Sequence, residues 1–158
     1  MKLLVLGIGQ SLRGDDVAGL ETVRLWQEKY PKTAERVAVE LSELPGLVLL
    51  DLLEGKDAAI LVDAVRSPES AGKIIRLGSN ELASFMTDAR FAHGWGVAET
   101  LHLGRAIEPS LKNCRITLLG IVGKDFSMGA GLSPQVNKVL DEAAELIEWE
   151  LQNYISEI

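Results

Sequence analysis

Uninterrupted apolar runs alternate along this chain with segments in which apolar residues recur every three or four positions. The runs at 3–8, 58–62 and 116–122 have the length and continuous apolarity of strands buried on both faces, as in a parallel sheet. Shorter runs at 36–41 and 73–77 predict two further strands. The alternation of strands with helical patterns indicates crossover connections and a mostly parallel sheet.

Helical spacing predicts the elements between these strands. It predicts two longer helices at 17–30 and 97–106, and two shorter ones at 47–53 and 80–86. We expect Pro31 to end the first of these helices, because proline lacks the amide proton that a helix interior needs.

The end of the chain predicts one long helix. Ser133 and Pro134 supply an N-cap and a first helical residue, and apolar residues from Val136 to Leu151 form one face. The expected fold class is therefore α/β. We expect a three-layer sandwich in which a mostly parallel, twisted sheet of about five strands carries helices on both faces. Residues 1–158 are expected to form a single domain.

A loop rich in glycine follows the first strand and ends in two carboxylates. Gly9 and Gly14 permit a tight turn and close backbone approach, and Asp15 and Asp16 come directly after Gly14. A dinucleotide-binding loop needs a third glycine where this chain has Leu12. A phosphate-binding loop needs lysine after its last glycine, where two carboxylates stand. Nucleotide binding is therefore disfavoured.

Composition and charge narrow the function classes further. The formal net charge of −7 argues against binding to nucleic acid by phosphate attraction and against anionic membrane surfaces. No apolar run approaches the roughly 20 residues of a membrane span, and no signal-peptide pattern opens the chain, so we expect a cytoplasmic protein. Cys114 is the only cysteine, which excludes an internal disulfide and a cysteine-based zinc site. We expect its thiol to be buried.

Polar residues at the strand ends supply the candidate chemistry. Asp16 follows the first strand, Asp63 ends the third, and His93 lies in a later loop flanked by glycine. In a parallel sheet all three loops open at the same carboxyl edge. Two carboxylates and an imidazole make a three-ligand set for a divalent transition metal with one position left open, as catalytic metal sites have.

Each of these residues also has a purely structural explanation. Asp16 can stabilise the start of the first helix, Asp63 can end its strand in an Asx turn, and His93 can bond to backbone. His102 falls inside a helical pattern, where a surface or packing position is expected. Trp95 suits either a contact residue in a loop or packing against the sheet.

Five segments together carry a family resemblance. They are the opening strand and loop at 4–16, the strand 60–64, the histidine loop 92–96, the late strand 118–121 and the start of the last helix at 132–134. In this order and spacing they resemble the nickel–iron hydrogenase maturation endopeptidases, and the resemblance covers nearly the whole chain.

The resemblance implies a hydrolase that removes the C-terminal extension of a nickel–iron hydrogenase large-subunit precursor after nickel insertion. Asp16, Asp63 and His93 map onto the family's metal-contacting residues, and these are also the implied catalytic residues. The nickel belongs to the substrate, and no organic cofactor is implied. The implied partner is the precursor protein, on which a monomeric protease docks transiently.

Departures from the family pattern leave the client hydrogenase open. Gln10 stands where the family usually has asparagine, and residues 41–45 replace an Asp-Gly-Gly-like segment. Other function classes also stay open. One is a metal-dependent hydrolase of a small substrate, with its own metal in the same three residues. Another is a non-catalytic module that binds nucleotide or senses metal during hydrogenase assembly, and a third is a family member without activity.

Overall fold

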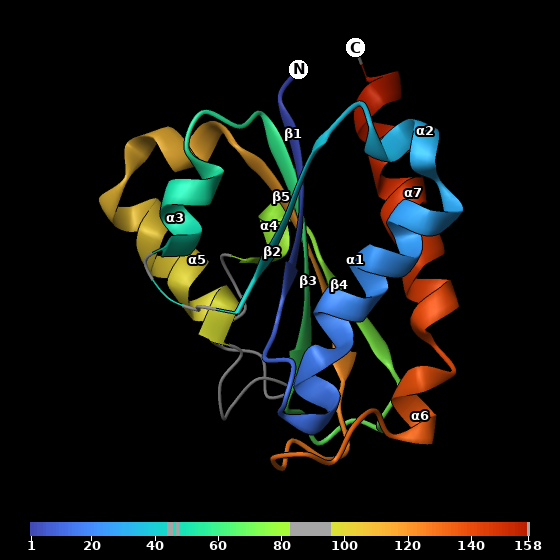
Figure 1. The fold of residues 1–158 in the computed structure, drawn as a ribbon. Helices are drawn as coiled ribbons and strands as arrows, with labels where there is room; N and C mark the ends of the chain where they lie inside the picture. The colour runs from blue at the N-terminus through green and yellow to red at the C-terminus, as the bar shows by residue number, and fades with distance from the viewer. Residues whose placement is uncertain (44–45, 47, 83–95, 158) are drawn as a thin grey trace.

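A five-stranded sheet forms the middle layer of the molecule (Figure 1). The structure, a computed structural model, describes residues 1–43, 46, 48–82 and 96–157. The sheet contains β1 (Leu3–Ile8), β2 (Ala38–Ser42), β3 (Ala58–Val65), β4 (Ile74–Leu77) and β5 (Arg115–Val122). Their order is β2-β1-β3-β5-β4, and only the pairing of β4 with β5 is antiparallel. The predicted fold class is confirmed.

Helices cover both faces of the sheet (Figure 1). One face carries α3 (Val48–Leu53), α4 (Ser79–Leu82) and α5 (Gly96–Ile107), and the other carries α1 (Ala18–Lys29), α2 (Pro31–Ala34), α6 (Pro134–Asn137) and α7 (Leu140–Ser156). Short 3-10 helices span Gly14–Val17 and Pro109–Asn113. None of the helices in the described ranges is both long enough and apolar enough to cross a membrane.

The central strands β1, β3 and β5 are apolar at most positions because their side chains enter two cores, one on each face of the sheet. Successive side chains of a strand point to opposite faces. Leu4 and Leu6 of β1 therefore enter the core beneath α3 and α5, whereas Leu3 and Val5 enter the core beneath α1 and α7. Burial on both faces explains why the period-two alternation of a one-sided sheet is missing here.

Three boundaries differ from the sequence predictions. Strand β3 runs on to Val65, so Asp63 lies inside the strand and does not end it in an Asx turn. Pro31 follows the end of α1 as expected, but it also begins α2, because its fixed φ suits the first position of a helix. The second strand spans Ala38–Ser42 instead of 36–41.

The predicted long final helix is interrupted. It forms as α6 and α7, separated at Lys138 and Val139. Ser133 occupies the N-cap position of α6, but its side chain makes no capping hydrogen bond because it is bonded to Asp15 instead. The predicted helix at 80–86 is seen as α4, and residues 83–86 lie outside the described residues.

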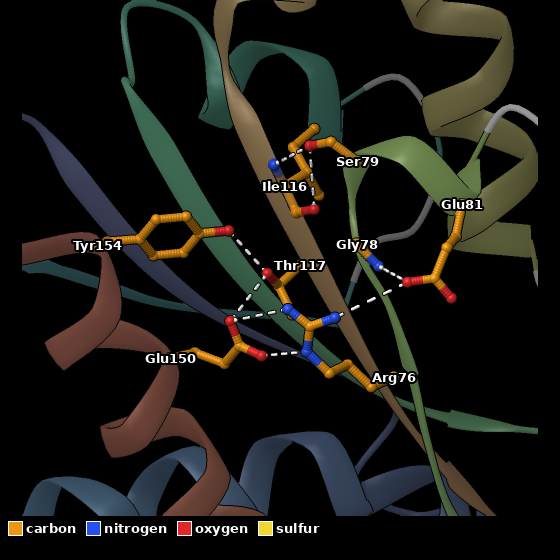
Figure 2. Close-up of polar contacts among 8 residues, drawn as sticks. All are labelled: Arg76, Gly78, Ser79, Glu81, Ile116, Thr117, Glu150 and Tyr154. Carbon is orange, nitrogen blue, oxygen red and sulfur yellow. Dashed lines mark hydrogen bonds and ion pairs between the residues drawn. The ribbon is translucent and has the colours of Figure 1, made fainter. Parts of the chain in front are cut away.

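A buried polar network joins α7 to the edge of the sheet (Figure 2). Arg76 of β4 forms an ion pair with Glu150 of α7, whose side chain is almost completely buried. The Thr117 hydroxyl of β5 donates to the Glu150 carboxylate at 3.4 Å and lies 2.7 Å from the Tyr154 hydroxyl. The network therefore binds together three elements, including the antiparallel edge strand.

Candidate active site

The candidate site lies where the connections from neighbouring strands diverge. Helix α1 leads from β1 to β2 over one face of the sheet, and α3 leads from β2 to β3 over the other. Such a change of face opens a crevice at the carboxyl ends of the two strands involved, here β1 and β3. Asp16 follows β1 and Asp63 belongs to β3, and both line two adjoining hollows of about 210 and 130 Å³. We call these two hollows the cleft.

Close backbone packing fixes Asp16 at the cleft. A side-chain carbon at Gly9 would overlap the carbonyl oxygen of Asp16, so only glycine lets the loop after β1 fold against the 3-10 helix that carries Asp16. Partial burial raises the pKa of the Asp16 carboxyl. A hydrogen bond from the Gln10 backbone amide and the positive charges of Arg66 and Arg13 oppose that shift without cancelling it.

Asp63 is held by the sheet itself. It pairs in register with Gly120 of β5, and the strand continues for two residues beyond it. Its exposed fraction is only 9%, yet it lines both hollows of the cleft. The prediction that Asp16 and Asp63 meet at one edge of the sheet is therefore confirmed.

His93 and the neighbouring Trp95 lie outside the described residues, so the three-residue set stays a prediction. Within the described ranges no group of three or more histidine, cysteine, aspartate or glutamate side chains is arranged to hold a metal ion.

Asp15, next to Asp16 in the chain, is fully buried and has a different role. Its carboxylate accepts hydrogen bonds from the backbone amides of Lys124, Asp125 and Ser133 and from the Ser133 hydroxyl, at 2.7–3.1 Å. Burial raises the pKa of Asp15, but these four hydrogen bonds together outweigh it, so its pKa is lowered. Asp15 is thus an internal anchor that the sequence did not distinguish from its neighbour.

Backbone contacts on either side of Asp15 hold the same two loops together. The Asp15 amide donates to the carbonyl oxygen of Asp125 at 2.8 Å. Gly14 has a φ of +55°, and a side-chain carbon there would overlap that same oxygen. The loop 123–133 is therefore fixed against the loop after β1 by contacts on both sides of Asp15.

Glu43 ties a third loop to the cleft. The Ser11 backbone amide donates to its carboxylate at 2.7 Å, and the backbone and side-chain hydrogen bonds of Ser11 lower the pKa of Glu43. Glu43 follows β2 and lines the smaller hollow with Asp16 and Asp63. It thus links the ends of β1 and β2, a role that the sequence left open.

Two arginines and a phenylalanine also line the cleft, and no pattern in the sequence pointed to them. Arg13, Arg66 and Phe126 line the larger hollow together with the two carboxylates. The Arg66 guanidinium carbon lies 4.3 Å from the centre of the Phe126 ring. The cleft therefore contains cations as well as the carboxylates that the strand ends predicted.

Two other candidate residues have structural positions. His102 lies within α5 on an exposed position, as predicted for a surface residue of a helix. Cys114 is 2% exposed, and burial raises the pKa of its thiol to about 11. The predicted buried thiol is confirmed.

Comparison with known proteins identifies related chains across most of the sequence. A family model, HycI, described as hydrogenase maturation protease, matches residues 26–150. The hydrogenase 2 maturation protease of Escherichia coli strain K12 is 27% identical over 148 residues, which cover 93% of this chain and 88% of that protein. Protein FrxA of Pyrococcus furiosus is 28% identical over 137 residues, or 85% of this chain and 93% of that protein.

Solved structures show the same fold. The structure of the [NiFe] hydrogenase maturation protease HybD from Thermococcus kodakarensis is 28% identical, with a TM-score of 0.71, and covers 94% of this chain and 97% of that one. The hydrogenase maturating endopeptidase HybD from E. coli is 24% identical, with a TM-score of 0.77 over 98% of this chain and 94% of that one, and supports the fold alone.

Proposed function

The chain belongs to the hydrogenase maturation protease family, and from that premise we propose that it removes the C-terminal extension of a nickel–iron hydrogenase large-subunit precursor. The observation that carries the proposal is the meeting of Asp16 and Asp63, from two neighbouring strand ends, in one cleft. The proposal keeps two expectations of the sequence analysis, a cytoplasmic location and a monomeric state.

The metal in this proposal arrives with the substrate. Asp16, Asp63 and His93 would contact a nickel ion already inserted in the precursor, so that cleavage depends on a loaded metal site. Carboxylate oxygens and an imidazole nitrogen are suitable ligands for such an ion. Nickel held there would act as a Lewis acid, either on the carbonyl of the bond to be cleaved or on a bound water.

The carboxylates offer a second contribution, the movement of a proton. Water adds to the carbonyl carbon, the C–N bond breaks, and a proton must reach the leaving nitrogen. The raised pKa of Asp16 favours that exchange, because a carboxyl group transfers protons best when its pKa lies close to the working pH.

The test is processing of a purified precursor, followed as mass lost from its C-terminus. Nickel-loaded precursor should be shortened by the wild-type protein, and nickel-free precursor should stay intact. Asp16→Asn and Asp63→Asn should each slow processing by at least about 100-fold, since each removes a charge at the reacting centre. Asp51→Asn, the same change at an exposed position of α3, should process like wild type.

Two results would overturn the proposal. One is equal shortening of nickel-loaded and nickel-free precursor, which would remove the metal checkpoint. The other is tight binding of the precursor without any change in its mass, which would favour a non-catalytic role in hydrogenase assembly.

A further inference from the structure

Arg66 is placed beside the two carboxylates of the cleft by the strand that carries Asp63. It follows directly after the end of β3 and lines the larger hollow with Asp16 and Asp63. Its charge acts on the Asp16 carboxyl more strongly than that of Arg13, the second arginine among the described residues that line the hollow. Arg66 therefore lies close to the centre at which the proposed reaction takes place.

Phe126 gives the Arg66 guanidinium a fixed support. The guanidinium carbon lies 4.3 Å from the centre of the ring, a cation–π contact. The ring itself occupies the space that a side chain at position 123 would need. It belongs to the loop 123–133, which Asp15 anchors through four hydrogen bonds. The buried anchor and the cleft are thus connected through Phe126.

The ring contact leaves the hydrogen-bonding capacity of Arg66 available. A guanidinium has five N–H donors that spread outward in one plane, more than a single aromatic ring can engage, so donors remain for a bound substrate. The fork of donors matches the geometry of a carboxylate, to which it can donate two parallel hydrogen bonds.

We propose that Arg66 is a catalytic residue that donates hydrogen bonds to the carbonyl oxygen of the peptide bond being cleaved, an inference that rests on the proposed function. When water adds to the carbonyl carbon, the π electrons of the C=O bond move to this oxygen and make it an oxyanion. Collapse of the oxyanion breaks the C–N bond, and the proton lost by water passes through a cleft carboxylate to the leaving nitrogen. The oxygen then belongs to a new C-terminal carboxylate.

The charge on the carbonyl oxygen changes during the reaction, and this change determines whether Arg66 affects kcat or KM. The amide oxygen is neutral in the bound substrate, so it interacts weakly with the guanidinium. The interaction strengthens as the oxyanion forms, and an interaction that is stronger in the transition state than in the ground state raises kcat more than it lowers KM.

The experiment measures kcat and KM for nickel-loaded precursor with four variants. Arg66→Gln should lower kcat by about 100-fold and change KM by less than about threefold. Arg66→Lys keeps the charge but loses the fork, and should recover part of kcat. Phe126→Leu removes the support and should lower kcat less than Arg66→Gln does. Arg36→Gln, at an exposed arginine just before β2, is the matched control and should behave like wild type.

The dependence of kcat on pH distinguishes a hydrogen bond from Arg66 to the substrate from a purely electrostatic effect of Arg66 on Asp16. If Arg66 served only to keep Asp16 ionised, Arg66→Gln would shift the acidic limb of the profile and restore wild-type kcat at high pH. That result would overturn the inference, as would a change confined to KM. Thermal unfolding of Arg66→Gln and Arg66→Lys should match wild type, because Arg66 is exposed.

Failure of the inference and failure of the proposed function give different results. Wild-type processing with an unimpaired Arg66→Gln variant would overturn the role of Arg66 alone. A wild-type protein that leaves nickel-loaded precursor intact would overturn the proposed function and the role of Arg66 with it.

Discussion

Asp15 and Ser133 are separated by 118 positions in the chain, yet both the backbone amide and the hydroxyl of Ser133 donate hydrogen bonds to the Asp15 carboxylate, at 2.7 and 2.8 Å. Neither residue lines the cleft. Their contact joins the loop that supplies Asp16 to the loop that supplies Phe126. The geometry of the cleft therefore depends on a carboxylate that does not itself line it.

Replacing Asp15 should cost much more stability than replacing an exposed aspartate. Asp15→Asn removes the charge that four donors share, and hydrogen bonds to charged groups contribute about 1.5–3 kcal/mol each. Because these contributions are not additive, we expect a loss of about 3 kcal/mol in the free energy of unfolding, measured in urea. Asp51→Asn should change it by less than about 0.5 kcal/mol. Equal effects of the two substitutions would contradict the anchor role.

The same anchor should weaken in acid. The pKa of Asp15 is lower in the folded protein than in the unfolded chain, so its stabilising contribution is complete above the unfolded pKa of about 3.9. That contribution is lost as the pH falls through the folded pKa. The difference in unfolding free energy between wild type and Asp15→Asn should therefore shrink below about pH 4. A difference that stays constant down to pH 2 would show that the carboxylate charge is unimportant.

The ion pair between Arg76 and Glu150 should stabilise the edge of the sheet (Figure 2). Arg76→Met leaves a buried carboxylate without its cation. We expect a loss of about 2–3 kcal/mol, below the full cost for a buried pair because Arg76 is partly exposed. Adding Glu150→Gln should recover part of that loss, and a double-mutant cycle in urea measures the coupling.

Lys73→Met is the matched control for Arg76→Met. It breaks the more exposed ion pair between Lys73 and Glu69 and should cost less than about 1 kcal/mol. A double-mutant cycle that gives no coupling between Arg76 and Glu150 would show that the buried network contributes packing alone.

The two histidines should differ in their effect on processing. His93→Ala should abolish processing of nickel-loaded precursor, because the proposed function gives His93 a contact to nickel. His102→Ala, at an exposed position of α5, should leave processing unchanged. Wild-type processing should also fall in acid, since an imidazole must be neutral to bind metal. Normal processing by His93→Ala would remove His93 from the site.

The single thiol should be inert in the folded protein. Burial raises the pKa of Cys114 to about 11, so very little thiolate is present at pH 8. Iodoacetamide should therefore leave native protein unmodified by mass and fully active, and should modify one site in protein unfolded in urea. Rapid alkylation of the native state would indicate frequent local opening around β5.

The sequence predicted the parts of the fold that depend on local pattern. Strands β1, β3 and β5 were recognisable because both faces of each are buried, which makes their apolar runs continuous. The meeting of Asp16 and Asp63 followed from the parallel arrangement of these strands. Their positions are consequences of strand order and direction, which the alternation of elements already indicated.

The sequence could not predict contacts between loops that are distant in the chain, because these depend on the positions of the loops in the folded protein. Asp15 and Asp16 are chemically identical neighbours, and only the position of loop 123–133 makes one an anchor and the other a cleft residue. The same loop takes the Ser133 side chain away from its expected capping role. Arg66 and Phe126 become recognisable as a pair only in three dimensions, because 60 positions of the chain separate them.

The strand order has a consequence for how the protein is made. β4 comes fourth in the chain but lies outside β5, so its only partner among the strands that the structure describes is one made later. During synthesis from the N-terminus, β4 and the free side of β3 cannot pair with β5 until residue 122 has left the ribosome. Ser133, which completes the Asp15 anchor, emerges later still. A nascent chain therefore has no finished cleft until most of its length has been synthesised.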